Sequence, residues 1–403
     1  MGSKSIMFMV YVFFLIATVQ AGSSRPGVFN VKNYGAVNNA AKDNAPAFLK
    51  AWTEACAAPG AYVKVLVPKG TFGLGPVIFN GPCKAKMIHF EVKGTLKAST
   101  DLNKFKTDGW VAFYEITGFK LSGGGVFDGQ GTSAWPYNKC PLKKHCKLLP
   151  HSIRFDKLTN ARISGITSLN SKMFHMNINL CKDIALDSIT IIAPDLSPNT
   201  DGIHMGNSVG VNITNSNIGT GDDCISVGSG THKLYVKGIT CGPGHGLSIG
   251  SLGRYDWEED VSDITVTNCT LKGTTNGLRI KTWEESPKET KVSNLVFTNI
   301  KLINVLNGVL VDQEYCPFVS CSKKAPSKVK LTNVLFDKIS GTSASKEAIK
   351  IICSKSRPCE GVKLGDIHLT YSGTAVGKDG VLTSTCSNAH ITSIGKQTPG
   401  ACK

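Results

Sequence analysis

The phrase DGIHM at residues 201–205 recurs along the chain, and its recurrence decides the fold. Further copies are DCISV at 223–227, HGLSI at 245–249, NGLRI at 276–280, NGVLV at 307–311 and DGVLT at 379–383. Their first residues are 22, 22, 31, 31 and 72 residues apart, and the longest interval holds another copy, EAIKI at 347–351. Most copies place a small residue before an apolar, polar, apolar run, which is typical of a strand with one buried face.

A second kind of strand phrase alternates with the first. Its copies are KDIALDSITI at 182–191, VGVNITNSNI at 209–218, VSDITVTNCTL at 261–271, VSNLVFTNIKL at 292–302 and CEGVKLGDIHL at 359–369. Units of 20 to 40 residues with two or three short strands each predict a right-handed parallel β-helix, with one coil per unit. Leucine-rich repeats would need an LxxLxLxxN phrase that the chain does not contain, and Rossmann or TIM folds would need a helix between strands.

Composition agrees with a single all-β domain. The 403 residues are 41% hydrophobic and 18% charged, and they include 42 glycines without a three-residue period, which favours a turn-rich β architecture. The one convincing amphipathic helix pattern is APAFLKAWTEACAA at residues 45–58. In a solenoid, a short N-terminal helix of this kind is expected to cap the first coil.

The N-terminal stretch predicts secretion. Lys4 precedes the apolar run IMFMVYVFFLIATVQA, and Val19 and Ala21 are the small residues that a signal-peptidase site needs before Gly22. A membrane anchor would need roughly 20 apolar residues, so we expect residues 1–21 to be a signal peptide. Residues 22–403 are then one domain with no membrane segment in the mature form.

The cysteines and two sequons fit an extracellular protein. Fourteen cysteines form an even set, and the close pairs Cys140/Cys146, Cys316/Cys321 and Cys353/Cys359 could each close a short loop, although spacing does not fix the connectivity. Asn212 and Asn268 begin N-x-Thr sequons and are predicted glycosylation sites.

The charge of the chain indicates an acidic partner. The formal net charge is +16, or +15 once Lys4 leaves with the signal peptide. The lysines are scattered and do not form tracts with interleaved aromatic residues, so an acidic polysaccharide fits better than nucleic acid.

The repeat register brings acidic residues together. Asp201, Asp223 and His245 each occupy the first position of a repeat copy, so they should stack on neighbouring coils about 4.8 Å apart, with Asp222 beside the middle residue. We expect these carboxylates on a solvated surface, where their mutual repulsion costs stability and therefore suggests a function.

Two cations share this outer face. In NGLRIK the inward residues are Leu278 and Ile280, which leaves Arg279 and Lys281 projecting outward. A ladder of this kind could hold a metal ion, but cations next to it would repel Mg²⁺ or Ca²⁺, so we expect no metal and no cofactor.

Four motifs resemble the signatures of the polygalacturonases, glycoside hydrolase family 28. They are Asn199-Thr-Asp201-Gly202, Gly221-Asp222-Asp223-Cys224, Gly244-His245-Gly246 and Arg279-Ile280-Lys281. The resemblance covers essentially the whole mature chain. It implies a right-handed parallel β-helix and the hydrolysis of α-1,4-linked galacturonate, with inversion at the anomeric carbon.

The resemblance also implies roles for single residues. Asp222 resembles the general acid, Asp201 and Asp223 resemble the carboxylates that hold and deprotonate the attacking water, and His245 resembles the residue that supports the acid's proton. Arg279 and Lys281 resemble the pair that binds the substrate carboxylate. Asn199 and Tyr315 resemble substrate-binding residues.

The mode of action depends on a departure from the family pattern. The stretch NSKMFH at 170–175 carries Lys172 where the family commonly has proline, and together with KNYGA near the N-terminus it is most similar to plant pollen-type exopolygalacturonases. We therefore expect a secreted, monomeric exo-enzyme of the plant cell wall. The alternatives are an endo-polygalacturonase, a pectate lyase, a rhamnogalacturonan hydrolase and a non-catalytic pectin-binding solenoid.

Overall fold

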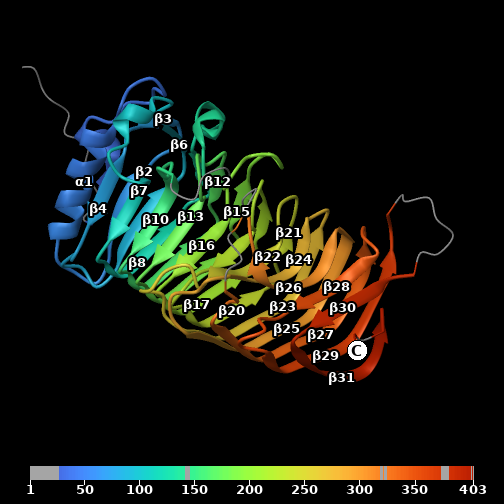
Figure 1. Cartoon of the computed structure of the whole chain (residues 1–403). Coiled ribbons are helices and arrows are strands. Elements are labelled where there is room, and N and C mark those ends of the chain that lie inside the picture. The colour runs from blue at the N-terminus through green and yellow to red at the C-terminus, as the bar shows by residue number, and fades with distance from the viewer. Residues whose placement is uncertain are drawn as a thin grey trace, which may run out of the picture.

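The chain forms a right-handed parallel β-helix, as the repeats predict. The structure, a computed structural model, describes residues 27–140, 146–317, 321, 325–373, 381–400 and 402. The predicted signal peptide at 1–21 lies outside the described residues. In Figure 1 the coils follow one another along a single axis, from helix α1 at one end to strand β31 at the other.

One sheet is formed by the strands that contain DGIHM and its repeat copies. It has eleven parallel strands, and neighbouring strands in the sheet belong to successive coils. The strands are β4 (Val77–Asn80), β7 (Gly109–Tyr114), β10 (His151–Asp156), β13 (Met176–Asn179), β16 (Ile203–Gly206), β19 (Ile225–Val227), β22 (Leu247–Leu252), β24 (Asn276–Trp283), β26 (Asn307–Tyr315), β28 (Glu347–Ile352) and β30 (Thr383–Ser387).

The second sheet has twenty strands and begins as two ladders. The first ladder contains β1 (Val28–Asn30), β2 (Val63–Val67), β5 (Ile88–Val92), β8 (Thr117–Ser122), β11 (Thr159–Ser164), β14 (Lys182–Asp187), β17 (Val209–Thr214) and β20 (His232–Lys237). The other contains β3 (Thr71–Leu74), β6 (Thr95–Ala98), β9 (Val126–Asp128), β12 (Thr167–Leu169), β15 (Thr190–Ile192), β18 (Asn217–Gly219) and β21 (Thr240–Cys241).

The two ladders merge at a long strand. β23 (Val261–Lys272) pairs with both β20 and β21, so one continuous strand replaces two short ones. The later strands of this sheet keep that form: β25 (Thr290–Val305), β27 (Val329–Ser343), β29 (Cys359–Tyr371) and β31 (Ala389–Thr398). The cross-section of the coils therefore changes from three strands to two at this point.

The core is built by residues that share one position in successive coils. In the eleven-stranded sheet, one such row pairs in register and is buried along its whole length: Ile203, Ile225, Leu247, Leu278, Val309 and Ile349. Burial of these side chains stabilises the fold only when the coils stack on one another. A single coil is too small to form a hydrophobic core of its own.

The predicted N-terminal helix is confirmed. α1 (Ala45–Ala57) contacts β1, β2 and β4, so it covers the first coil. Its Trp52 is 3% exposed and donates an indole hydrogen bond to the carbonyl oxygen of Asn80, and the disulfide Cys56–Cys83 joins the helix end to the next coil. The other helical segments among the described residues are short 3-10 turns: η1 (Val31–Tyr34), η2 (Leu102–Lys104), η3 (Gly131–Ser133) and η4 (Trp135–Tyr137).

Six disulfides use twelve of the fourteen cysteines. The three close pairs considered from the sequence all form: Cys140–Cys146, Cys316–Cys321 and Cys353–Cys359. The other three are Cys56–Cys83, Cys224–Cys241 and Cys386–Cys402. Cys181 and Cys269 are buried thiols, and burial raises the pKa of each to about 11. Within the described residues, no helix is long and apolar enough to cross a membrane.

Phenylalanine rings fill the coils under the helix, and Phe113 lies at their centre. It is fully buried, and its ring centroid lies 4.5 to 6.1 Å from those of Trp52, Phe79, Phe90, Phe119 and Phe155. Contacts between aromatic rings add to the free energy gained by burying them, so this cluster holds α1 and the first coils together.

Replacing Phe113 with alanine tests the importance of the aromatic cluster. We expect Phe113→Ala to lower the free energy of unfolding by about 3–5 kcal/mol, because it removes a buried ring and leaves a cavity. Ile78→Ala on the adjacent strand β4 is the control, because Ile78 is 44% exposed and its loss should cost no more than about 1 kcal/mol. Denaturant unfolding of both variants measures the difference, and equal losses would contradict this account of the core.

Candidate active site

The predicted acidic ladder is present. Asp201, Asp223 and His245 each lie two positions before the first inward-facing residue of β16, β19 and β22, and these inward residues pair in register. The prediction that the ladder lies on a solvated surface is wrong for two of its members, because Asp201 is 6% exposed and Asp223 is fully buried. Side chains from neighbouring coils cover them, and alternation along one strand cannot show this.

Asp222 is the most exposed of the three carboxyl groups and lines the open cleft. Its side chain is 17% exposed, and its Oδ1 lies 2.9 Å from Nδ1 of His245. The backbone N–H of Asp223 donates to the same oxygen at 2.8 Å, while the side-chain amide of Asn199 donates to Oδ2 at 3.3 Å. Asp222 is therefore held in one orientation by groups from three coils.

Asp223 is held between two cations. Arg279 donates to Oδ1 at 2.6 Å and Lys281 donates to Oδ2 at 2.8 Å, while the hydroxyl of Ser248 adds a third bond at 2.8 Å. Burial alone would raise the pKa of Asp223, but the charges of Arg279 and Lys281 outweigh it and lower this pKa to about 2. Asp223 is thus a permanent anion at physiological pH.

Asp201 has the opposite electrostatic environment. Burial, followed by the nearby charges of Asp222 and Asp223, raises the pKa of Asp201 well above its ordinary value. The hydroxyl of Ser226 donates to its Oδ2 at 2.6 Å. Two carboxyl groups at the same position of neighbouring coils therefore differ in basicity, and Asp201 is the stronger proton acceptor.

His204 completes a short hydrogen-bonded chain to Asp201. Its Nδ1 lies 2.8 Å from the hydroxyl oxygen of Ser226, which in turn donates to Asp201. Burial, with a smaller contribution from Lys281, lowers the pKa of His204 to about 4, so the ring is neutral at physiological pH. The ring of Phe174 lies between His204 and His151, with centroid distances of 4.6 and 4.7 Å.

The predicted substrate-binding residues line the same cleft. Asn199 accepts a hydrogen bond from the side-chain amide of Asn138 at 3.1 Å in addition to its contact with Asp222. Tyr315 ends strand β26, and its ring centroid lies 5.4 Å from Nζ of Lys281 and 5.3 Å from that of Trp283. Burial raises the pKa of Tyr315, so its phenol is neutral.

The cleft has a volume of about 660 Å³ and two different ends. Towards the N-terminal coils its wall contains Leu148, Met173 and Phe174, together with the disulfide Cys140–Cys146. Towards the C-terminal coils its wall contains Arg254, Trp283, Tyr315 and Pro317. Among the described residues, those that line one end are thus mainly apolar, while those at the other end include an arginine and aromatic rings.

The sequence predicted the charged residues of the site but not the residues that hydrogen-bond to them or line the cleft beside them. Ser226 and Ser248 occupy the polar position in DCISV and HGLSI, so the same alternation could have assigned both to the outer face. Arg254 comes after β22 ends and Trp283 is the last residue of β24, and no repeat position marks either of them.

The acidic group could in principle hold a metal ion. Within the described residues, ligand atoms of Asp222, Asp223 and His245 lie within 4.8 Å of one another. However, both oxygens of Asp223 already accept hydrogen bonds from Arg279 and Lys281, and these cations would repel a divalent ion. The donor set fits an ion-paired site better than a metal site.

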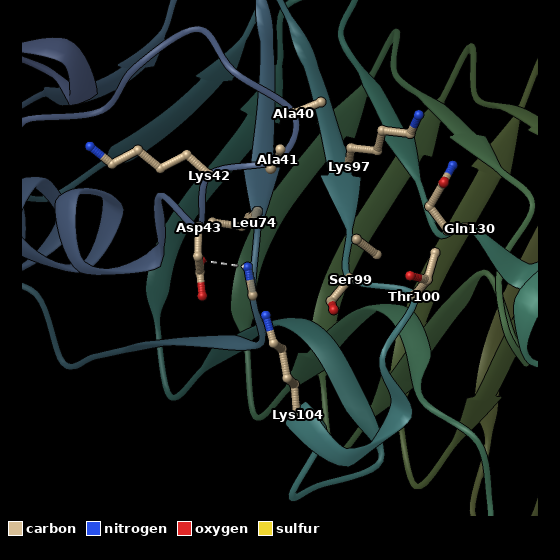
Figure 2. Close-up of a pocket in the computed structure, with 13 residues that line it drawn as sticks. Ala40, Ala41, Lys42, Asp43, Leu74, Lys97, Ser99, Thr100, Lys104 and Gln130 are labelled. Carbon is tan, nitrogen blue, oxygen red and sulfur yellow. Dashed lines mark hydrogen bonds between the residues drawn. The ribbon is translucent and has the colours of Figure 1, made fainter.

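A second hollow lies among the N-terminal coils and shares no lining residue with the cleft. Figure 2 shows three lysines that line it, Lys42, Lys97 and Lys104. Its volume is about 380 Å³. Asp43 accepts hydrogen bonds from the backbone N–H groups of Gly75 and Ala45, at 2.8 and 2.9 Å, so its carboxylate holds the local backbone. None of the predicted site residues lines this hollow, and we do not assign chemistry to it.

The predicted glycosylation sites lie on the other sheet. Asn212 is on β17 and Asn268 is on β23, both are exposed, and both strands belong to the twenty-stranded sheet. The acidic ladder belongs to the eleven-stranded sheet. Glycans at these positions would therefore project from a different face than the cleft.

Comparison with known proteins assigns the chain to a family. The model of "Glycosyl hydrolases family 28" matches residues 56–398. An exopolygalacturonase of Platanus acerifolia is 50% identical over 376 residues, which is 93% of this chain and 98% of the relative. A polygalacturonase of Brassica napus is 51% identical over 89% of each chain. The structure of an exopolygalacturonase from Thermotoga maritima has a TM-score of 0.73, at 16% identity, over 92% of each chain and so shares the fold. With its fold, its ladder of acids and these matches, the chain belongs to family 28 of the glycosyl hydrolases.

Proposed function

We propose that this chain is a secreted polygalacturonase that hydrolyses the α-1,4 bonds of polygalacturonate with inversion, as an exo-enzyme that releases galacturonate from the non-reducing end. The observation that carries the proposal is the contact of Asp222 with His245 beside an Asp223 that is bound by Arg279 and Lys281. A proton donor can protonate the oxygen of a glycosidic bond. A fixed pair of cations beside it can bind the carboxylate of an acidic sugar.

Asp222 is the general acid of the proposed reaction. It faces the cleft, where it can give a proton to the oxygen of the leaving sugar. Asn199 and His245 hold its carboxyl group, and a protonated His245 stabilises the carboxylate that remains after the transfer. The Asp222 contact is the largest contribution to the raised pKa of His245, so the ring keeps its proton to a higher pH than a free histidine.

Asp201 and Asp223 act on the water molecule. In an inverting mechanism the acid and the base lie on opposite sides of the bond with room for water between them, and Asp201 and Asp222 come from neighbouring coils. The raised pKa of Asp201 makes it the better acceptor of the proton from the water. Asp223, with a pKa of about 2, remains an anion and orients the water.

Arg279 and Lys281 bind the carboxylate of the substrate with their remaining donors. Arginine has five N–H donors and lysine has three, so hydrogen bonds to Asp223 leave donors for a second carboxylate. Tyr315, which lies beside Lys281, contacts the sugar ring. This arrangement requires no cofactor and no metal.

The two ends of the cleft favour exo action. In an exo-enzyme, one end of the cleft must block the polymer so that a chain terminus fits there. The other end must bind the rest of the polymer. Among the described residues of the cleft wall, Leu148, Met173 and Phe174 at the N-terminal end carry no charge, whereas Arg254 lies at the opposite end. A polyanion that enters from the C-terminal coils would thus place its terminal sugar against the apolar wall.

Secretion to the plant cell wall, as a monomeric glycoprotein, completes the proposal. Six disulfides suit an oxidising compartment, and polygalacturonate is a polymer of that wall. Glycans on Asn212 and Asn268 would leave the cleft open, since both residues lie on the other sheet.

Replacement of the general acid gives the first test. We expect Asp222→Asn to lose at least about 1,000-fold in kcat on polygalacturonate with little change in KM, because the amide has the same shape but cannot transfer a proton. Asp263→Asn on the twenty-stranded sheet is the matched control and should retain activity. Reducing ends released per minute measure both. Near-normal turnover by Asp222→Asn would rule out its role, and a wild type that binds polymer without turnover would point to a binding protein.

The pH profile tests the roles of Asp201 and His245. As pH falls through the raised pKa of Asp201, this residue gains a proton and no longer accepts one from water, which gives an acid limb. As pH rises through the pKa of His245, which lies above 6.5, the ring loses its proton and activity falls. We expect a bell-shaped kcat/KM profile, and His245→Gln should lower activity and remove the alkaline limb set by this ring. An unchanged alkaline limb in His245→Gln would exclude the assignment.

Product analysis tests the mode of action. An exo-enzyme should release only monomer from a defined hexagalacturonate from the first minutes, because each event removes one terminal unit. Reduction and labelling of the substrate's reducing end identifies the attacked end, since the label should stay on the shortening polymer. Early oligomers of several lengths would show endo action, and unsaturated products would show a lyase.

A further inference from the structure

A buried lysine lies beside the apolar end of the cleft. Lys172 directly precedes Met173 and Phe174, which line that end, but Lys172 itself is only 2% exposed. Burial lowers the pKa of Lys172 to about 8, and the charge of Asp128 opposes this lowering only in part. Because an ammonium group is costly to remove from water, a lysine at this position suggests a role for its charge.

The ammonium group of Lys172 joins two neighbouring coils. Its Nζ donates a hydrogen bond to the carbonyl oxygen of Gly129 and lies 5.0 Å from the ring centroid of Phe105. Gly129 follows strand β9 and begins the strap, which we define as residues 129–138 and which contains η3 and η4. Lys172 lies in the turn between β12 and β13, one coil further along, because β9 pairs with β12. The lysine therefore fastens the strap to the next coil.

Close backbone contacts add to this bond. The N–H of Gly131 donates to the carbonyl oxygen of Asn170 at 2.7 Å, and the indole N–H of Trp135 donates to that of Ser171 at 3.0 Å. A Cβ atom at Gly131 would lie 2.3 Å from the carbonyl oxygen of Ser171, so the two segments can approach this closely only because the strap has a glycine there. Of these contacts the one from Lys172 is charge-assisted, and such bonds are roughly twice as strong as neutral ones. Its loss should therefore loosen the strap most.

The far end of the strap reaches the proposed general acid. The side-chain amide of Asn138 donates to Oδ1 of Asn199 at 3.1 Å and to the carbonyl oxygen of Pro198 at 3.2 Å. Asn199 in turn donates to Asp222 at 3.3 Å. The orientation of the Asp222 carboxyl group is thus linked to the position of the strap.

The middle of the strap supports the apolar wall. Ala134 packs with Leu149 and Met173 in a small hydrophobic cluster that is separate from the main core. The hydroxyl of Ser171 donates to the carbonyl oxygen of Phe174 at 2.8 Å, which ties the wall to the same turn that the strap contacts. A displacement of the strap would therefore move the wall as well.

We propose that Lys172 is a positioning residue that fixes the strap against the apolar wall and thereby restricts cleavage to the terminal sugar. Without its bond to Gly129, the wall at Met173 and Phe174 can move aside, and the cleft accepts a polymer that continues past the cleaved bond. This inference rests on the proposed exo action. It assigns a function to a buried charge that the proposed mechanism does not otherwise use.

Product analysis of a Lys172 variant tests this role. Lys172→Met keeps an apolar stem but removes the hydrogen-bond donor. From hexagalacturonate the wild type should release only monomer, whereas Lys172→Met should release oligomers of several lengths from the first minutes and lose roughly 10-fold in kcat/KM for monomer release. Lys182→Met is the matched control, because Lys182 is an exposed cation on β14 of the other sheet and its loss changes the net charge equally.

The length of the products separates positioning from a general loss of stability. A merely structural effect would slow the release of monomer without producing oligomers, and that result would overturn the proposal. Trp135→Phe, which removes only the indole N–H bond of the strap, should release oligomers to a smaller extent, and it decides the question if Lys172→Met does not fold. Monomer alone from both variants would overturn the proposal. Oligomers from the wild type would instead overturn the proposed exo action, and this inference with it.

Discussion

In-register stacking of parallel coils is the constraint on which the structure depends. Adjacent strands of a sheet lie about 4.8 Å apart, so residues at one position of successive coils form a row. Inside the helix this produces continuous apolar rows such as the one through Ile203, Ile225 and Leu247. Outside, it places Asp201, Asp223 and His245 side by side, although 22 residues separate each from the next. The same spacing thus builds both the core and the reactive group.

The buried ion pairs of Asp223 are the costly part of this arrangement. Removing a carboxylate, a guanidinium and an ammonium group from water is unfavourable unless their hydrogen bonds are well made, and here Arg279, Lys281 and Ser248 all bind one carboxylate. These ion pairs give two neighbouring carboxyl groups very different pKa values. Asp223 is kept ionised while Asp201, only one coil away, has a raised pKa. Paired acids with such different environments are what proton transfer at a single site requires.

The sequence predicted what depends on strand period and little of what depends on side-chain packing. Alternation correctly placed Arg279 and Lys281 on the outer face, because Leu278 and Ile280 must point inward. It could not show that both cations fold back onto Asp223, since that contact depends on rotamers of long side chains across two coils. For the same reason the ladder was expected to be solvated, whereas Asp201 and Asp223 are buried. Glu258, a buried carboxylate that accepts hydrogen bonds from the backbone N–H groups of Gly253 and Arg254, was missed because these partners lie in an irregular segment after β22.

The two thiols left outside the disulfides have a consequence for how the chain matures. Cys181 and Cys269 lie in the interior, and a pKa of about 11 leaves each with very little thiolate near neutral pH. Thiolate is the species that attacks a disulfide, so in the folded chain neither residue can readily exchange with the six existing bonds. Before the coils stack, however, burial does not yet protect these two thiols, so both are open to oxidation and exchange. Stacking of the coils around Cys181 and Cys269 therefore withdraws the two remaining thiols from exchange, because the other twelve cysteines are already bonded.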